Sequence, residues 1–275
     1  FMRYQMNDKR DYIMKNIEEK YNYLQNLGYK VIAIYLQGSQ NYGLDVYDDD
    51  YKSDIDAKAI VIPKLEDIIL NKKPVSTTIV MDNNEHIDVK DIRVMKDMFI
   101  KQNLSYLELL YTDYYKYDSE FEEELEELKS IRNLVSDINR NQLFRCIKGM
   151  SMEKLKALEH PYPNLLDKIE KFGYDPKQLH HILRLNEFIT RYVLGESFEC
   201  CYKTYNPIKL IEVKKGCYSL DKARQLAVEY DADTKYICDN FITDNEIVNY
   251  ETIEKLNNII TKILKKSFKE ELRKE

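Results

Sequence analysis

The fold can be inferred from one stretch of sequence, Gly38-Ser39-Gln40-Asn41-Tyr42-Gly43-Leu44, which an acidic loop separates from Ser53-Asp54-Ile55-Asp56. The first segment follows residues 31–36, a β-branched apolar run typical of a strand, and the second opens a similar run that ends at Pro63. A glycine at a strand end lets the backbone approach a ligand, and a helix beginning there points free N–H groups at an anion. Taken alone, the Gly-Ser pair is a very weak signal, because it is far more often an ordinary junction between a strand and a turn.

The second segment places two carboxylates close together. Asp54 and Asp56 are two residues apart at the start of a strand, so both should lie on one face of it while Ile55 points to the other. Such carboxylates repel each other unless a cation lies between them, and Mg²⁺ or Mn²⁺ prefers hard oxygen ligands at this spacing. Phosphoryl-transfer sites hold two such ions about 3.5–4 Å apart. An isolated Asp-x-Asp would more often be a charged strand edge.

A third carboxylate should come from a neighbouring strand. Residues 76–81 and 86–92 are two strand-like runs joined by a turn-favouring Asp-Asn-Asn-Glu, which predicts a hairpin. Asp88 lies in the middle of the second run, on the face opposite its apolar neighbours. Because a register slip of one residue exchanges the two faces, Glu85 and Asp91 are its rivals.

The rest of the chain is mostly helical in its periodicity. Residues 8–27 form an amphipathic pattern that stops at a glycine, and helical spacing returns from residue 92. Further helical patterns cover residues 119–134, 137–158, 176–195, 219–231 and about 244–273. We therefore predict an α/β (α+β) fold in two parts. Residues 2–115 would form a core with a small mixed sheet flanked by helices, and residues 116–275 an α-helical domain.

One predicted helix carries a row of basic residues. Lys177, His181 and Arg184 are spaced at i, i+4 and i+7, which places them on one face. Three potential cations on one face favour an anionic ligand, with arginine the bidentate partner and lysine a point charge. Without other information, such a row would more often be a solvated surface with a packed histidine.

Composition sets limits on the class of protein. A formal charge of −6 disfavours non-specific coating of duplex nucleic acid, which needs a dense basic surface, but leaves room for a local basic cleft. No stretch approaches the ~20 consecutive apolar residues that cross a membrane, so we expect a cytoplasmic protein with no membrane partner. The five cysteines are odd in number and lack C-x-x-C spacing, so we expect reduced thiols and no structural zinc.

Together, the two segments resemble the signature of the DNA polymerase β nucleotidyltransferase superfamily. The resemblance is closest to the branch of predicted nucleotidyltransferases that is common in bacteria and phages and is associated with RNA repair. It spans about residues 30–230 and includes segments 104–110, 173–185 and 210–220. The loop that contains Asp45, Asp48, Asp49 and Asp50 is longer and more acidic than is usual in that family.

The resemblance implies a metal-dependent nucleotidyltransferase. It would move a nucleoside monophosphate from an NTP, with ATP the favoured donor, to an acceptor hydroxyl and release pyrophosphate. Asp54, Asp56 and Asp88 would bind Mg²⁺ or Mn²⁺. The nucleotide-binding residues would be Gly38, Ser39, Tyr42, Gly43, Ser53, Lys177, His181 and Arg184. An RNA end is the favoured acceptor; a protein or a small molecule is the alternative, as is a non-catalytic binding protein that keeps the fold.

Overall fold

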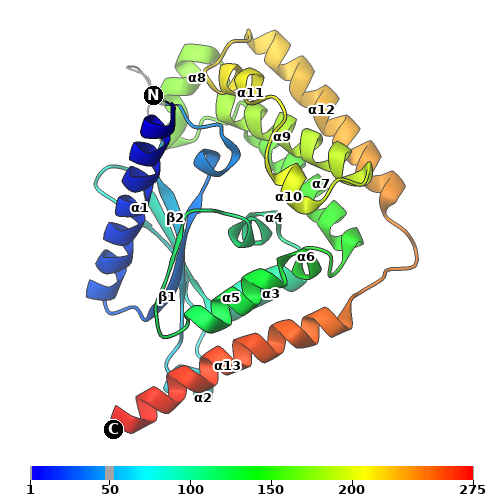
Figure 1. The fold of residues 1–275 in the computed structure, drawn as a ribbon. Helices are drawn as coiled ribbons and strands as arrows, with labels where there is room; N and C mark the ends of the chain where they lie inside the picture. Colours follow the sequence, from blue (N-terminus) through cyan, green and yellow to red (C-terminus); the bar gives the residue numbers. More distant parts are fainter. Residues whose placement is uncertain (1, 47–52, 275) are drawn as a thin grey trace. The chain divides into compact units, whose positions relative to one another are not determined.

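The chain forms two compact units in a computed structural model that describes residues 2–46 and 53–274 (Figure 1). Unit 1 comprises the described residues of Phe1–Asn41, Ser53–Ile138 and Val248–Glu275. Unit 2 comprises the described residues of Tyr42–Lys52 and Asn139–Ile247. This division differs from the predicted boundary at residue 115. Helices from both sides of that boundary pack in unit 1, and the periodicity of a helix does not reveal which core it joins.

A five-stranded mixed sheet forms the centre of unit 1, with strand order β3-β4-β2-β1-β5. Its strands are β1 (Val31–Gln37), β2 (Asp56–Val61), β3 (Ser76–Val80), β4 (His86–Asp91) and β5 (Tyr115–Tyr117). β2 and β4 are parallel, and every other pair is antiparallel. The predicted mixed sheet and the β3–β4 hairpin are confirmed. The three-residue strand β5 was not predicted because it is too short to show alternation.

Helix α1 (Met2–Asn26) covers one face of this sheet (Figure 1). Its apolar side chains, spaced at helical intervals, pack against alternate residues of β1, β2 and β4. The fully buried members of this core include Ile13, Ile17, Leu24, Ile34, Leu36, Ile55, Ala57, Ala59, Ile87 and Val89. Because strand side chains alternate between faces, the residues between these apolar positions lie on the opposite face of the sheet.

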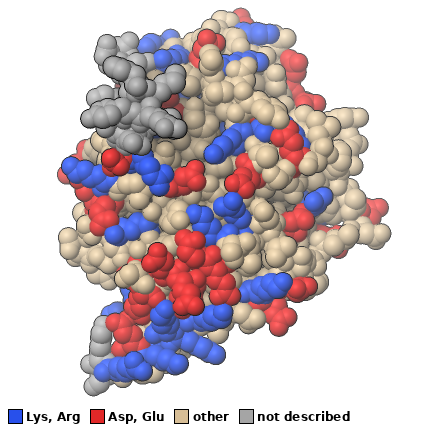
Figure 2. Space-filling model, in the orientation of Figure 1, with Lys and Arg blue, Asp and Glu red and all other residues tan. Residues whose placement is uncertain are grey.

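The remaining helices of unit 1 are α2 (Leu65–Ile69), α3 (Ile92–Ile100), α4 (Leu104–Leu107), α5 (Glu122–Ser130), α6 (Arg132–Val135) and α13 (Tyr250–Lys274). α13 packs along α3, α5 and α6. Figure 2 shows acidic side chains gathered over α5 beside basic ones along α13. Two ion pairs, Lys262–Glu127 and Lys266–Glu124, join these two helices. Complementary charge and a buried apolar stripe therefore hold α13 in unit 1.

Unit 2 is helical, consisting of α7 (Arg140–Ala157), α8 (Leu166–Phe172), α9 (Pro176–Val193), α10 (Phe198–Tyr202), α11 (Pro207–Lys214) and α12 (Leu220–Phe241). α9 is central and contacts α7, α10, α11 and α12. Asp175 caps its N-terminus, where Pro176 occupies the first turn. No helix in the described part of the chain combines the length and the apolar character that crossing a membrane requires.

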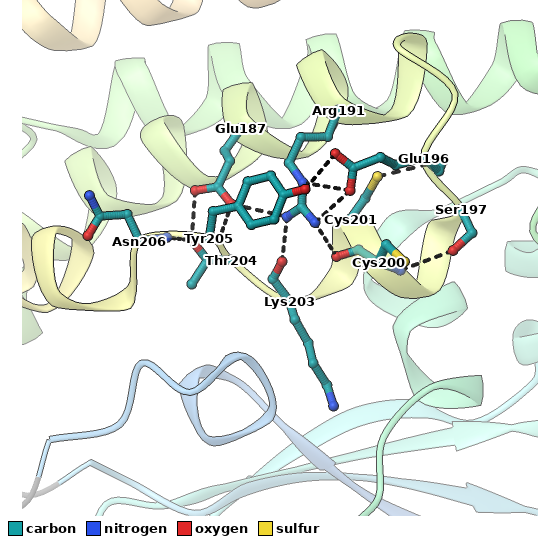
Figure 3. Close-up of polar contacts among 10 residues, drawn as sticks. All are labelled: Glu187, Arg191, Glu196, Ser197, Cys200, Cys201, Lys203, Thr204, Tyr205 and Asn206. Atoms are coloured by element: carbon teal, nitrogen blue, oxygen red, sulfur yellow. Dashed lines mark hydrogen bonds and ion pairs between the residues drawn. The ribbon is translucent and has the colours of Figure 1, made fainter.

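A buried arginine organises the connection between α9 and α11 (Figure 3). The Arg191 guanidinium binds the carboxylates of Glu187 and Glu196 and donates to the carbonyl oxygens of Lys203 and Cys200. The Tyr205 ring lies 3.7 Å from it. A cavity of about 290 Å³ adjoins this network. Since each charge of the network already has partners, we assign it a structural role.

Candidate functional site

The Gly-Ser segment forms a tight turn at the end of β1. Gly38 has a φ of 89°, a backbone conformation that favours glycine. The Asn41 amide N–H donates to the Gly38 carbonyl, and its side chain donates to the Leu36 carbonyl and accepts from Thr112. The expected helix is only a four-residue 3₁₀ helix, Ser39–Tyr42. Such a short helix contributes little dipole, so any anion here would depend on individual N–H and hydroxyl groups.

Gln40 joins the two predicted segments. Its side chain is buried, and its Nε2 donates to the carbonyl oxygens of Ser53, at 3.4 Å, and Asp54, at 3.2 Å. Ser53, a predicted nucleotide contact, is itself buried. The structure thus brings the turn and the aspartate pair together in unit 1. Sequence reasoning did not identify Gln40, because only the fold shows that its amide reaches across the loop.

The aspartate pair has the predicted alternation. Ile55 is fully buried in the core beneath α1, whereas Asp54 is exposed and the Asp56 side chain is 27% exposed. Asp56 lies opposite Gln37 in β1. Its Oδ1 accepts the His86 N–H at 2.8 Å and lies 3.4 Å from His86 Nδ1. Two carboxylates therefore flank one buried side chain at the start of β2.

Glu85 and Asp91, the two alternatives to Asp88 as third carboxylate, both form structural contacts. Glu85 accepts the Ile55 N–H at 3.0 Å and forms a buried ion pair with Lys20. Burial raises the pKa of Glu85, but hydrogen bonds from Lys20 and Ile55 outweigh it and hold the pKa below its usual value. Asp91 caps α3 and binds the Arg93 guanidinium through both oxygens.

Asp88 lies on the same sheet face as Asp56, because Ile87 and Val89 point into the α1 core. Its Oδ1 accepts the Thr78 hydroxyl at 2.6 Å, and its Oδ2 lies 3.9 Å from Lys58 Nζ. Within residues 2–46 and 53–274, no three His, Cys, Asp or Glu side chains are grouped as a metal site. Binding of a divalent cation by Asp54, Asp56 and Asp88 therefore stays a prediction.

Sequence reasoning missed Lys58. Its side chain points to the same face as Asp56 and is almost fully buried, with Nζ 3.9 Å from the centre of the Tyr106 ring. Burial lowers the pKa of Lys58 to about 8, against the opposing effect of Asp88. The available signal was a lysine two positions after the second aspartate, within a strand of otherwise apolar residues.

The basic row of α9 differs from a solvated face. Arg184 is buried, with its guanidinium 3.7 Å from the centre of the Tyr42 ring. Burial, followed by the neighbouring positive charges, holds the pKa values of His180 and His181 well below 6.5. The lowered pKa keeps His181 in its neutral form at pH 7, so His181 is not one of the cations of this face.

The segment after the turn packs in unit 2. Tyr42 meets the Tyr202 ring edge to face at 5.3 Å, and Lys214 donates to the Leu44 carbonyl at 3.2 Å. Gly43, with a φ of 72°, allows the chain to turn between these anchors. The predicted acidic loop continues through residues 47–52, which lie outside the described residues.

Comparisons with known proteins give little further information. No protein-family model and no curated protein sequence matches the chain. A crystal structure of a nucleotidyltransferase-like protein from Exiguobacterium sibiricum 255-15 is similar to 82% of this chain and 73% of its own, with 10% sequence identity and a TM-score of 0.29. A TM-score this low does not establish a shared activity.

Proposed function

We propose that the chain is a metal-dependent nucleotidyltransferase. The observation that carries the proposal is the arrangement of Asp54 and Asp56 on either side of a buried Ile55, tied through Gln40 to the Gly38–Asn41 turn. A strand-end turn beside two carboxylates provides both groups that a nucleoside triphosphate needs: N–H donors for phosphate oxygens and hard ligands for its cation.

In this reaction the acceptor hydroxyl oxygen attacks the α-phosphorus of the NTP. A new P–O bond forms, the bond to the β-phosphate oxygen breaks, and pyrophosphate leaves with the electron pair. Asp54 and Asp56 would hold Mg²⁺ or Mn²⁺, which neutralises charge on the phosphates. Asp88, on the same sheet face, would accept the hydroxyl proton. Gly38 and Ser39 would hold phosphate oxygens through backbone and hydroxyl hydrogen bonds.

Unit 2, taken by itself, carries the other residues proposed as phosphate contacts. Lys177 and Arg184 are the residue types that suit a phosphate, whereas His181, whose pKa burial holds well below 6.5, would offer a hydrogen bond only. Tyr42 and Gly43 position this group through the stacking of Tyr42 on Arg184. The resemblance to an RNA-repair branch supports an RNA end as acceptor and ATP as donor; the formal charge of −6 favours a protein or small-molecule acceptor.

The test is incubation with each α-³²P-labelled NTP and MgCl₂ or MnCl₂, with and without total RNA, followed by identification of the labelled product. We expect Asp54→Ala and Asp56→Ala to abolish labelling while circular dichroism stays unchanged. Asp97→Asn, an exposed aspartate on α3, is the matched control and should label normally. Undiminished labelling by Asp54→Ala would contradict the proposal.

A further inference from the structure

We propose that the Lys58 ammonium, rather than a second metal ion held by Asp88, supplies the positive charge beside Asp88, so that the site takes one divalent cation per chain. This inference rests on the proposed function and makes it more specific. It concerns only unit 1, in which β2 and β4 carry Asp56, Lys58 and Asp88.

The register of the sheet determines the position of Lys58. β2 and β4 are parallel, and Lys58 lies directly opposite Asp88. Asp56 is two residues before Lys58 on the same strand, so its carboxylate shares the same face. Lys58 therefore extends from the strand that carries Asp56 toward the carboxylate of Asp88 on the neighbouring strand, with Nζ 3.9 Å from Asp88 Oδ2.

The surroundings of Lys58 keep its ammonium in this place. β2 lies between β1 and β4, and the Lys58 side chain is only 4% exposed. The Tyr106 ring, itself buried, packs 3.9 Å from Nζ and attracts the cation through its face. A charge that is buried without a partner is strongly unfavourable, so Asp88 and Tyr106 explain why a lysine is tolerated in this strand.

A second divalent cation would compete with these contacts. Asp88 Oδ1 already accepts the Thr78 hydroxyl, and a cation on Oδ2 would lie against the ammonium. Asp56 Oδ1 likewise accepts the His86 N–H. Lys58 is then a positioning residue that fixes the Asp88 carboxylate.

The experiment counts Mn²⁺ ions by electron paramagnetic resonance of the free ion, with and without α,β-methylene-ATP. We expect one Asp54-dependent Mn²⁺ per wild-type chain, and we expect Asp88→Asn to leave both this number and the affinity within twofold. Two ions per chain, reduced to one by Asp88→Asn, would overturn the inference and leave the proposed function standing. Absence of any Asp54-dependent ion would overturn both.

A second set of variants tests the positioning role. Lys58→Met keeps the length of the side chain without its charge, and we expect kcat to fall about 100-fold with little change in the KM for NTP. Lys58→Arg should recover part of kcat. Lys90→Met, a lysine on β4 that donates to Ser76, is the control and should retain kcat. Wild-type kcat in a folded Lys58→Met protein would contradict the role.

Discussion

In unit 1, a hydrogen bond from the backbone to one buried side chain holds the segment that carries the candidate aspartates. The amide between Asp54 and Asp56 donates to Glu85, whose second oxygen pairs with Lys20 from α1. A buried ion pair loses the hydration of both charges, and it often contributes little net stability. Its effect here is geometric, since one carboxylate links α1, the β3–β4 turn and the start of β2.

Breaking this pair should be costly because it leaves one buried charge alone. We expect Glu85→Gln to lower the free energy of unfolding by about 3 kcal/mol in urea titrations. The double variant Lys20→Met/Glu85→Gln should recover part of the loss. Glu18→Gln is the control, since its ion pair with Lys116 is half-exposed. Equal effects of the Glu85 and Glu18 variants would show that burial does not determine the cost.

Acid should destabilise the protein through the buried histidines of α9. His180 is almost fully buried, and its two ring nitrogens have no hydrogen-bond partner among the residues described. Below about pH 6.5 the unfolded chain takes up a proton on this histidine, whereas the folded chain, with its lowered pKa, does not. The unfolded state then binds more protons, so stability falls as the pH falls.

His180→Leu removes this contribution. Between pH 6.5 and 5.5 the stability of the wild type should decline by about 1 kcal/mol more than that of the variant, as measured by urea unfolding at each pH. His160→Gln, an exposed histidine, serves as the control and should follow the wild type. Parallel curves for wild type and His180→Leu would mean that His180 is protonated in the folded protein.

Among the secondary-structure elements, the turn after β1 depends on a single backbone conformation. Gly38 has a positive φ, and a Cβ built on it meets no atom within 4 Å. Gly38→Ala should therefore cost about 1 kcal/mol through backbone strain alone. Gly149 in α7 also has open space around its Cβ but has ordinary helical geometry, so Gly149→Ala should stabilise by a similar amount. Denaturant titrations giving the same sign for both would contradict this account.

The elements that the sequence predicted well are those with a repeating pattern. Runs of β-branched apolar residues identified β1 and β2, two strand-like runs around a turn signal identified the β3–β4 hairpin, and helical spacing identified α7, α9 and α13. The short elements β5, α8 and α10 were missed, since a few residues show no period. Period-two spacing also placed Asp56 and Asp88 on the sheet face opposite the α1 core. The partners of Asp88, Lys58 and Thr78, depend on strand register, which the sequence alone leaves open.

For the whole molecule, the division into units was the part least accessible from sequence. Residues 42–46 pack in unit 2 through Tyr42 and Leu44, although the residues up to Asn41 and those from Ser53 onward belong to unit 1. Residues 248–274 return to unit 1. These assignments arise from tertiary packing between distant segments, and no local propensity encodes them.

The burial pattern predicts which thiols react in the folded protein. Cys200 and Cys217 are exposed, whereas Cys201 and Cys238 are buried, and burial raises the pKa of each buried thiol to about 12. We expect iodoacetamide at pH 8 to alkylate Cys200 first and to leave Cys201 and Cys238 intact, as read by peptide mass spectrometry. All five should react in urea. Native alkylation of Cys238 as fast as Cys200 would contradict the packing of α12.

The path of α13 has a consequence for biosynthesis. This helix leaves the ribosome after every residue of unit 2, yet it completes unit 1, whose sheet is made much earlier. The helical unit can therefore fold while translation continues, whereas the apolar surface of α3, α5 and α6 stays uncovered until α13 has been synthesised. During that interval the nascent chain is most exposed to chaperones and to aggregation.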